Sequence, residues 1–334
     1  MRALVLRELR GPDAAELADV PPPAGAHPMG VGGRLLVEVH AAGVSFPDLL
    51  RSRGEYQMRP ELPFATGAEV AGVVVEADPD TGFAPGERVA GLTHWGGVAE
   101  LALVMPQHTL RLPDAMSYAQ GAALYLNYCT AWYALHRVGA REGETVLVQG
   151  AAGGVGTAAI ELIAARGARS IAVVSSDEKE AAVRALGADD VVRSTEPWLD
   201  AVRELTGGRG VQAVVDPVGG DRFLDSLRAL AIGGRLAVVG FTGGSIPELK
   251  VNRLLLRNLT VVGVEMVAMD SEVPGTVRMV NDAVQSLVDE GRITTLIGAR
   301  VPFERAGEAL RILERREAIG KVVVDVRPDG EAAG

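Results

Sequence analysis

Cysteine is almost absent from this sequence. Cys129 is the single cysteine among 334 residues, so the chain cannot form an internal disulfide or complete a cysteine-rich metal site. A chain with so little cysteine is suited to a reducing compartment. We therefore expect a cytoplasmic protein.

Long apolar runs and an excess of positive charge are missing as well. No stretch of about 18 uncharged apolar residues occurs, which is roughly the minimum for a membrane-spanning helix. Residues 1–10 are interrupted by Arg2, Arg7, Glu8 and Arg10, so they lack a signal-peptide core and are predicted to form a first strand. The net charge of -10 repels nucleic acids and anionic membranes. We expect a soluble protein with no nucleic-acid or membrane partner.

The composition is that of a globular chain with large cores. Hydrophobic residues make up 48% and charged residues 23%, and the length suggests about two domains. Short β-branched runs at 34–40 and 70–77 are bounded by glycine, proline or acidic residues, a pattern typical of strands. Residues typical of tight turns, chiefly glycine, recur through 82–91 and 96–100. These features predict a β-rich domain over residues 1–121.

The pattern changes between Thr145 and Val264, where short apolar runs alternate with helix-length stretches. Helices are expected to begin near Gly156, Glu178, Trp198 and Asp221. The expected strands are Thr145–Val148, Ile171–Val174, Val191–Val192, Ala213–Val215, Arg235–Val239 and Thr260–Val264. This alternation predicts an α/β fold with a Rossmann-type, doubly wound parallel sheet over residues 122–265.

The last part of the chain carries no further nucleotide-binding signal. Two amphipathic stretches, 274–290 and 305–317, precede an apolar run at 321–326 that is predicted to be a terminal strand. We expect residues 266–326 to return to the first domain. The polar tail 327–334 is expected to fray.

A glycine-rich turn follows the strand that ends at Val148. It spans residues 150–156, and its candidate phosphate-binding residues are Gly153, Gly154, Val155 and Gly156. Glycines let a turn be tight and let phosphates approach the N–H groups that open a helix. Ala151 breaks the literal GxGxxG spacing, but the strand before the turn and the helix after it supply the required context. The alternative is that these small residues only allow close helix packing.

The end of the second strand indicates which dinucleotide is bound. Sites that prefer NAD usually place an acidic residue there for the ribose 2′-hydroxyl, whereas this chain has Ser175 and Ser176. Together with Lys179 and Arg193, these hydroxyls would favour a 2′-phosphate, and hence NADPH. The neighbouring Asp177 and Glu178 oppose this interpretation, and they could simply begin a helix on which Lys179 is solvated.

Several stretches together resemble the medium-chain dehydrogenase/reductase superfamily, and within it the zinc-independent quinone oxidoreductase branch. They are residues 42–48, 53–56, 62–72, 85–89, 97–100, 150–156, 178–179, 186–188 and 320–321. The resemblance covers nearly the whole chain. It implies a GroES-like catalytic domain made from both chain ends around a Rossmann domain, a cleft between the two, and a homodimer.

The same resemblance argues against zinc. Zinc-dependent alcohol dehydrogenases of this superfamily carry a cysteine where this chain has Ser45 and a histidine where it has Ala68. A catalytic zinc site keeps three protein ligands, chiefly Cys and His. The remaining histidines have no paired spacing; they are His27, His40, His94, His108 and His136. We therefore expect metal-free chemistry.

By this resemblance, the reaction is hydride transfer from NADPH to an acceptor polarised by conjugation, either a quinone or an α,β-unsaturated carbonyl compound. The implied catalytic residues are Tyr56, as proton donor, with Ser45 and Asp48. The implied cofactor contacts, besides those given above, are Asn127, Thr130, Phe241, Thr242, Gly243 and Lys321.

Other roles remain open for these residues. Asp48 could cap a helix or pair with Arg51 or Arg53, and Tyr56 could be a packing residue. The family commonly has asparagine in place of Ser45 and tyrosine in place of Ser194, which are departures in this chain. Two alternative functions also remain: reduction or dehydrogenation of one particular enone, aldehyde or acyl substrate, and non-catalytic NADPH binding.

Overall fold

The computed structural model describes residues 1–327, so all of the expected tail except Arg327 lies outside the described residues. The described residues fall into two compact units. The first unit contains residues 1–126 and the chain from 277 onward, and the second unit contains residues 127–276. The chain therefore leaves the first unit once and returns to it.

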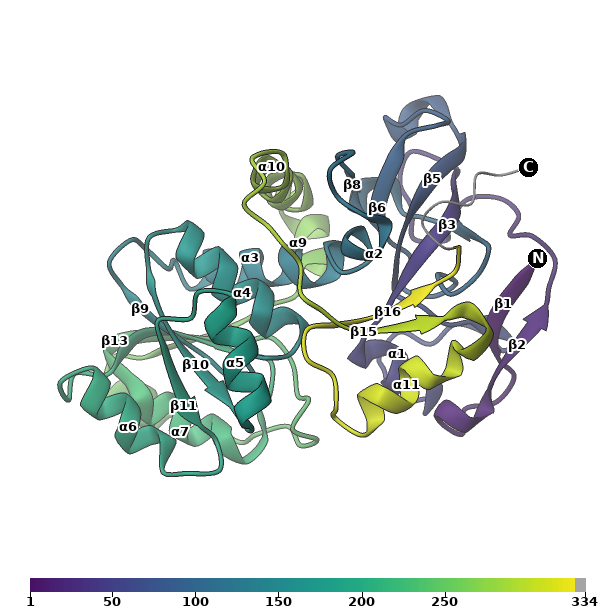
Figure 1. Cartoon of the computed structure of the whole chain (residues 1–334). Coiled ribbons are helices and arrows are strands. Elements are labelled where there is room, and N and C mark those ends of the chain that lie inside the picture. The colour runs from purple at the N-terminus through teal and green to yellow at the C-terminus, as the bar shows by residue number, and fades with distance from the viewer. Residues whose placement is uncertain (328–334) are drawn as a thin grey trace. The chain divides into compact units, whose positions relative to one another are not determined.

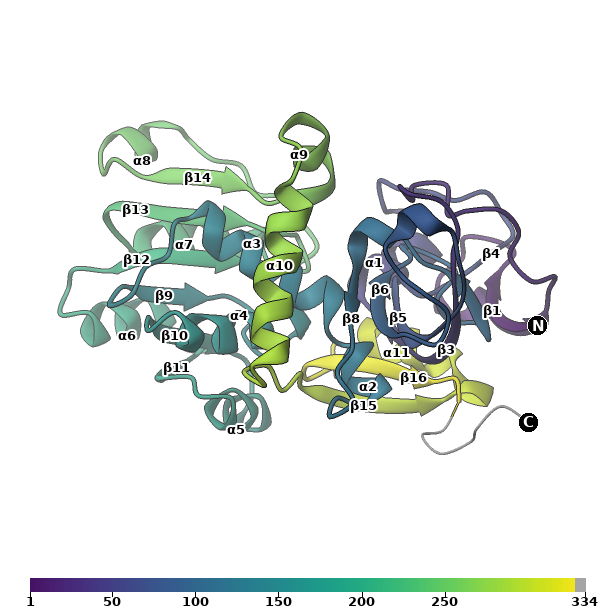
Figure 2. The same ribbon diagram turned by 90° about the horizontal axis from the view of Figure 1, so that it is seen from above.

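The second unit is built on one parallel sheet. Within residues 127–276 the sheet has six strands in the order β11-β10-β9-β12-β13-β14, as Figure 2 shows. Their bounds are β9 Thr145–Val148, β10 Arg169–Val174, β11 Asp190–Arg193, β12 Val211–Asp216, β13 Leu230–Val238 and β14 Thr260–Gly263. The order reverses beside β9, and so the prediction of a Rossmann-type, doubly wound parallel sheet is confirmed.

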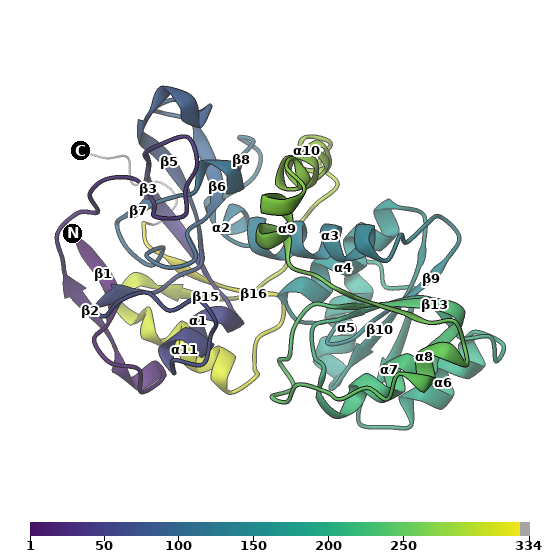
Figure 3. The same cartoon turned by 180° about the vertical axis from the view of Figure 1, so that it is seen from behind.

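Helices cover both faces of this sheet. Figures 1 and 3 show α3 and α4 on one face and α6 and α7 on the other. The helices are α3 Thr130–Arg137, α4 Gly154–Ala165, α5 Asp177–Ala185, α6 Trp198–Leu205, α7 Phe223–Ala229, α8 Asn252–Leu255 and α9 Met266–Glu272. The central strand β9 is completely buried from Val146 to Val148, because helices pack on both faces of the sheet. Each expected helix start lies within two residues of an observed one.

The first unit is rich in β structure. Among its described residues, seven strands form a mainly antiparallel sheet that includes β15-β16-β3-β5-β6-β8, with β7 paired to β3, and three form the sheet β2-β1-β4. The strands are β1 Arg2–Leu6, β2 Ala15–Asp19, β3 Leu35–Val44, β4 Phe64–Ala65, β5 Glu69–Ala77, β6 Arg88–Leu92, β7 Leu101–Leu103, β8 Thr109–Arg111, β15 Ile297–Pro302 and β16 Lys321–Asp325. The helices are α1 Phe46–Ser52, α2 Tyr118–Gly121, α10 Thr276–Asp289 and α11 Gly307–Glu314.

Strand β16 joins the C-terminal part of the chain to the N-terminal part. It pairs antiparallel with β3, so that Val322 lies opposite Val44. Both residues belong to the apolar core of this unit, together with residues of β5 and β6. Residues 321–325 therefore form an internal strand of the first unit's sheet, between β15 and β3.

The unit boundaries differ slightly from the expected domain boundaries of 121/122 and 265/266. Residues 122–126 belong to the first unit, where the Leu126 N–H donates to the buried Glu69. Helix α9 belongs to the second unit. Both differences arise from tertiary contacts that the local sequence pattern does not contain.

Candidate functional site

The glycine-rich turn connects β9 to α4. Gly150 has a φ of 56°, which favours glycine, and the Gly153 N–H donates to its carbonyl oxygen. A Cβ on Gly156 would lie 2.4 Å from the Gly150 oxygen, so a side chain there would collide with the turn. Helix α4 begins at Gly154, slightly before the expected start near Gly156. The turn therefore presents the N-terminus of a helix at the carboxyl edge of the sheet, a geometry suited to a pyrophosphate.

Asn127 packs directly against this turn. A Cβ on Gly154 would lie 2.7 Å from the Asn127 amide nitrogen, so only glycine leaves room for that amide. Asn127 is buried in a π-helical turn, Tyr125–Cys129, and Thr130 begins α3 directly after it. By contrast, a Cβ on Gly153 would meet only the Gly150 oxygen, at 3.4 Å. The open face at Gly153 is thus the side from which a phosphate could approach.

The predicted 2′-phosphate residues gather beyond β10 and β11. The Lys179 ammonium donates to Ser175 Oγ at 3.4 Å, and Ser176 Oγ caps α5 by accepting from the Lys179 N–H at 3.3 Å. The Arg193 guanidinium is ion-paired with both Asp177 and Glu180. The acidic residues at the start of α5 therefore neutralise part of the positive charge that the sequence suggested. Ser175 and Lys179 lie beside one another.

Phe241, Thr242 and Gly243 lie on the loop after β13. The Thr242 hydroxyl donates to the Pro217 carbonyl at 3.0 Å, and the Gly243 N–H donates to the Val218 carbonyl at 2.8 Å. These bonds fix the loop against the end of β12. The glycine turn and this loop therefore both lie at the carboxyl ends of the strands, where α/β sheets of this kind bind ligands.

The buried Asp216 ends β12 below that loop. Its Oδ1 accepts from the Val218 and Gly219 N–H groups, both at 2.9 Å, while Oδ2 has no partner among the described residues. Burial raises the pKa of the Asp216 carboxyl. Its bonds to the backbone hold the β12 end in place, so a structural role accounts for them.

The three predicted catalytic residues lie in the first unit. Ser45 precedes α1, Asp48 lies in its first turn, and Tyr56 follows it. Asp48 Oδ2 accepts from the Ser45 N–H at 2.9 Å, and Oδ1 accepts from Arg51 and from the Gly67 N–H, both at 3.2 Å. Burial raises the pKa of the Asp48 carboxyl, and the Arg51 guanidinium opposes that rise. Asp48 therefore caps the start of α1 and pairs with Arg51, which are structural roles that the sequence left open. A catalytic role for Asp48 remains a prediction.

Tyr56 lies against the same arginine. The Arg51 guanidinium carbon is 4.7 Å from the centre of the Tyr56 ring, and Arg51 is only 2% exposed. Arg51 Nε and Nη2 have no hydrogen-bond partner among the described residues. Tyr56 is half-buried. Its packing role is therefore visible, and its role as proton donor remains a prediction.

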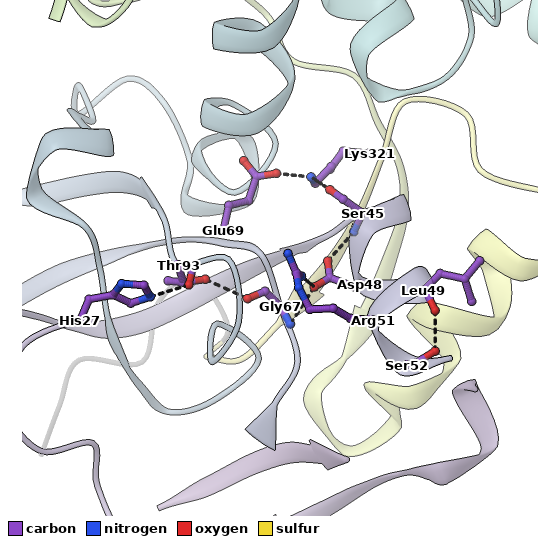
Figure 4. Close-up of polar contacts among 10 residues, drawn as sticks. All are labelled: His27, Ser45, Asp48, Leu49, Arg51, Ser52, Gly67, Glu69, Thr93 and Lys321. Atoms are coloured by element: carbon purple, nitrogen blue, oxygen red, sulfur yellow. Dashed lines mark hydrogen bonds and ion pairs between the residues drawn. The ribbon is translucent and has the colours of Figure 1, made fainter. Parts of the chain in front are cut away.

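Lys321 lies in the first unit at the start of β16. Its ammonium bonds to Glu69 Oε1 and to Ser45 Oγ, as Figure 4 shows. Lys321 and Glu69 are 3% and 0% exposed. The predicted cofactor contact through Lys321 is untested, but two of the three ammonium donors are already used within this unit.

Three of the histidines are buried in the first unit. His27 Nε2 lies 2.8 Å from the Thr93 carbonyl, and His108 Nδ1 lies 2.9 Å from the Tyr125 hydroxyl. Burial, helped by the nearby Arg51 charge, lowers the pKa of His94 to about 3, so this ring is neutral at physiological pH. Within residues 1–327, no group of three or more His, Cys, Asp or Glu side chains is arranged to hold a metal ion.

The sequence did not predict Glu69 as a site residue, because it lies within the longer motif 62–72 and the motif itself does not single it out. The signal was present, because a charged residue opens each of two buried apolar strands, at Glu69 and at Lys321. Buried charges are normally paired. Such a residue at the start of a buried strand predicts a partner, although not which one.

Two family profiles match this chain. That of the alcohol dehydrogenase GroES-like domain matches residues 32–114, and that of the zinc-binding dehydrogenase matches residues 154–296. The first match confirms the predicted GroES-like character of the β-rich part.

No helix of the described residues is long and apolar enough to cross a membrane.

Similar proteins align over almost the entire chain. Quinone oxidoreductase-like protein 2 of Bos taurus is 37% identical over 331 residues, which cover 98% of this chain and 93% of that protein. A mycobacterial protein solved in complex with NADPH has a TM-score of 0.87 and 33% identity, covering 97% of this chain and 99% of its own. The quinone oxidoreductase of Thermus thermophilus, also solved with NADPH, has a TM-score of 0.81 and 36% identity, covering 98% of this chain and 100% of its own.

Proposed function

This chain belongs to the quinone oxidoreductase branch of the medium-chain dehydrogenase/reductase superfamily, and we propose that it is a zinc-free, NADPH-dependent reductase of quinones or α,β-unsaturated carbonyl compounds. The observation that carries the proposal is the glycine turn, in which Gly156 has no room for a side chain while Gly153 is open. The NADPH complexes of two similar structures support the choice of cofactor.

The residues of the second unit fit the proposed cofactor. Gly153, Gly154 and Val155 would hold the pyrophosphate, while Ser175 and Lys179 would hold the 2′-phosphate. When bound, NADPH supplies the hydride. The protein has to orient the cofactor, provide hydrogen-bond donors where negative charge develops on the acceptor, and exclude water.

The proposal of zinc-free chemistry rests on the donor set. Ser45 and Ala68 stand at the positions where zinc-dependent relatives have a cysteine and a histidine. Ser45 Oγ is bonded to the Lys321 ammonium, and a neighbouring cation disfavours binding of a second one. An acceptor that is already polarised by conjugation does not need a Lewis acid.

Steady-state oxidation of NADPH with 1,4-benzoquinone and 9,10-phenanthrenequinone tests the function. We expect turnover well above the uncatalysed rate for at least one quinone. Enones, aldehydes and acyl substrates assayed in parallel would identify the alternative of a specific reductase. Tight NADPH binding without turnover on any acceptor would instead identify a non-catalytic NADPH-binding protein.

We propose in addition that the chain forms a homodimer through the β14 edge of the second unit. β14 is the last strand of its sheet, and α8 lies beside it in Figure 2. Several large apolar side chains of this unit are about three-quarters exposed, namely Ile232, Ile246, Val251, Leu255 and Leu256. Exposed apolar groups and an unpaired strand edge are typical of an interface.

Light scattering coupled to gel filtration tests the dimer. Leu255→Glu together with Leu256→Glu should produce a monomer, whereas the matched control Val31→Glu, at an exposed apolar residue of the first unit, should not. A wild-type monomer would contradict the proposal. A cytoplasmic location is also proposed, because the chain has a single cysteine and that cysteine is buried, and a fluorescent fusion would test it.

A further inference from the structure

Lys321 and Glu69 form a buried ion pair next to Ser45. Glu69 opens β5 and lies opposite Gly43 of β3, while Lys321 directly precedes Val322, which lies opposite Val44. The two charged side chains therefore meet across β3, at the end that leads to Ser45. Taking two charges out of water costs several kcal/mol each, so a buried pair is a weak source of stability. Its presence next to Ser45 therefore points to a role other than stability.

The hydrogen bond between Lys321 and Ser45 has only one possible direction. An ammonium group donates and cannot accept, so Ser45 Oγ must be the acceptor. The Ser45 O–H is then left to donate elsewhere, and it has no acceptor among the described residues. Ser45 is 8% exposed, compared with 3% for Lys321 and 0% for Glu69. The hydroxyl is thus the outermost group of a Glu69–Lys321–Ser45 chain.

This chain of polar groups is held rigidly. Glu69 Oε2 accepts from the Leu126 N–H at 3.0 Å, and the Ser45 N–H is anchored on Asp48. Gly43 makes room for the pair, because a Cβ on it would lie 2.7 Å from both Glu69 Cγ and Lys321 Cε. Groups held in this way need little reorganisation during a reaction.

We propose that Ser45 is the catalytic proton donor of the reaction, that Lys321 supplies the proton to Ser45, and that Glu69 is a positioning residue that keeps the ammonium in place. The inference rests on the proposed function. As the acceptor gains a hydride, its oxygen takes the proton of Ser45 Oγ, and Ser45 takes one from Lys321 Nζ. Lys321 becomes a neutral amine and regains its proton from water after the product leaves.

This assignment differs from the two roles that the sequence suggested. Tyr56 would not be the donor, and Lys321 would not contact the cofactor. The two ideas about Lys321 predict different losses: a relay residue affects the rate of the proton-dependent step, whereas a cofactor contact affects the NADPH dissociation constant.

Ser45→Ala and Lys321→Met test the relay, with Lys250→Met, at an exposed lysine, as matched control. Each variant is assayed with 1,4-benzoquinone, its tetramethyl derivative and its tetrachloro derivative, whose hydroquinone oxygens differ in basicity. A general acid contributes about 10²–10⁴-fold. We expect kcat/KM to fall at least about 10²-fold for the tetramethyl quinone and less than about 10-fold for the tetrachloro quinone, because the less basic oxygen needs the proton less.

The NADPH dissociation constant, measured by fluorescence titration, should stay within about twofold of the wild-type value in both variants. A buried Glu69 left alone could unfold Lys321→Met, so the double variant Lys321→Met/Glu69→Gln, which removes both charges, serves as its folded counterpart. Thermal unfolding checks that each variant is folded.

Three results would overturn the relay. They are equal losses for all three quinones, a weakened NADPH affinity with unchanged kcat in Lys321→Met, and a loss in Tyr56→Phe that depends more steeply on acceptor basicity than the loss in Ser45→Ala. Failure of the proposed function has a different signature, which is a wild-type protein that turns over no acceptor.

Discussion

Replacing Gly156 by alanine should disrupt the phosphate-binding turn, while the same replacement at Gly153 should leave the fold intact. The new Cβ at position 156 would lie 2.4 Å from the Gly150 oxygen and 2.6 Å from Ala151 Cα. At position 153 it would meet the Gly150 oxygen alone, at 3.4 Å. The same substitution at two positions three residues apart thus places the methyl group in very different surroundings.

The size of the effect follows from two opposing terms. Alanine is better than glycine inside a helix by about 1 kcal/mol, and Gly156 lies in the first turn of α4. Overpacking typically costs about 1–3 kcal/mol, and here the atoms in the way are backbone atoms of the turn, which cannot rotate aside. The cost should therefore lie in the upper part of that range, about 2–3 kcal/mol, which leaves a net loss of about 1–2 kcal/mol for Gly156→Ala. Gly153 is the N-cap residue of α4, where alanine should cost only about 0.5 kcal/mol.

Urea unfolding followed by circular dichroism measures the stability of both variants, and a fluorescence titration measures NADPH binding. Gly156→Ala should lose both stability and affinity, with a dissociation constant raised at least about 10-fold, which corresponds to about 1.4 kcal/mol. A methyl group on the open face at Gly153 could also weaken NADPH, so the decisive comparison is that of stability. Equal stability of the two variants would refute the steric reasoning.

Three further predictions concern charge. Lys179→Ala should weaken NADPH much more than NADH, since Lys179 lies beside Ser175 as a donor for the 2′-phosphate, and equal losses in binding titrations would contradict that role. Because the pKa of His94 falls from 6.5 to about 3 on folding, its contribution to stability is complete above pH 6.5 and is lost as the pH falls toward 3. Asparagine tolerates the φ of 55° at this position, so His94→Asn removes the ring without straining the backbone. This variant should reduce the slope of unfolding free energy against pH by up to about 1.4 kcal/mol per pH unit below pH 6.5. An unchanged slope in urea titrations at several pH values would be inconsistent with a buried neutral ring. Arg51→Met should destabilise the first unit by about 3–5 kcal/mol, because it leaves Asp48 buried without its ion partner, and adding Asp48→Asn should recover part of that loss; a single variant as stable as the wild type would show that the pair is dispensable.

Much of the fold could be predicted because it follows from patterns of apolar and polar residues within short segments of the sequence. The alternation of apolar runs and helix-length stretches predicted all six strands of the parallel sheet, since a buried strand and an amphipathic helix have different periodicities. The glycine turn was identifiable for the same reason, because the strand, the turn and the helix are consecutive in the sequence. Ser45 and Ala68 could be compared directly with the residues of a zinc site.

What only the tertiary structure decided concerns partners that are far apart in the chain. The sequence suggested positive charge at Arg193, and folding placed that guanidinium on Asp177 and Glu180. The sequence predicted Lys321 as a cofactor contact but gave no sign of its partners within the chain, and the pairing of β16 with β3 placed its ammonium beside Ser45 and Glu69. Side-chain periodicity reports which residues are buried, but the partner of a buried charge depends on strand register between distant segments. The sequence by itself therefore determined the nucleotide-binding architecture, and the tertiary structure decided which charges remain available for chemistry.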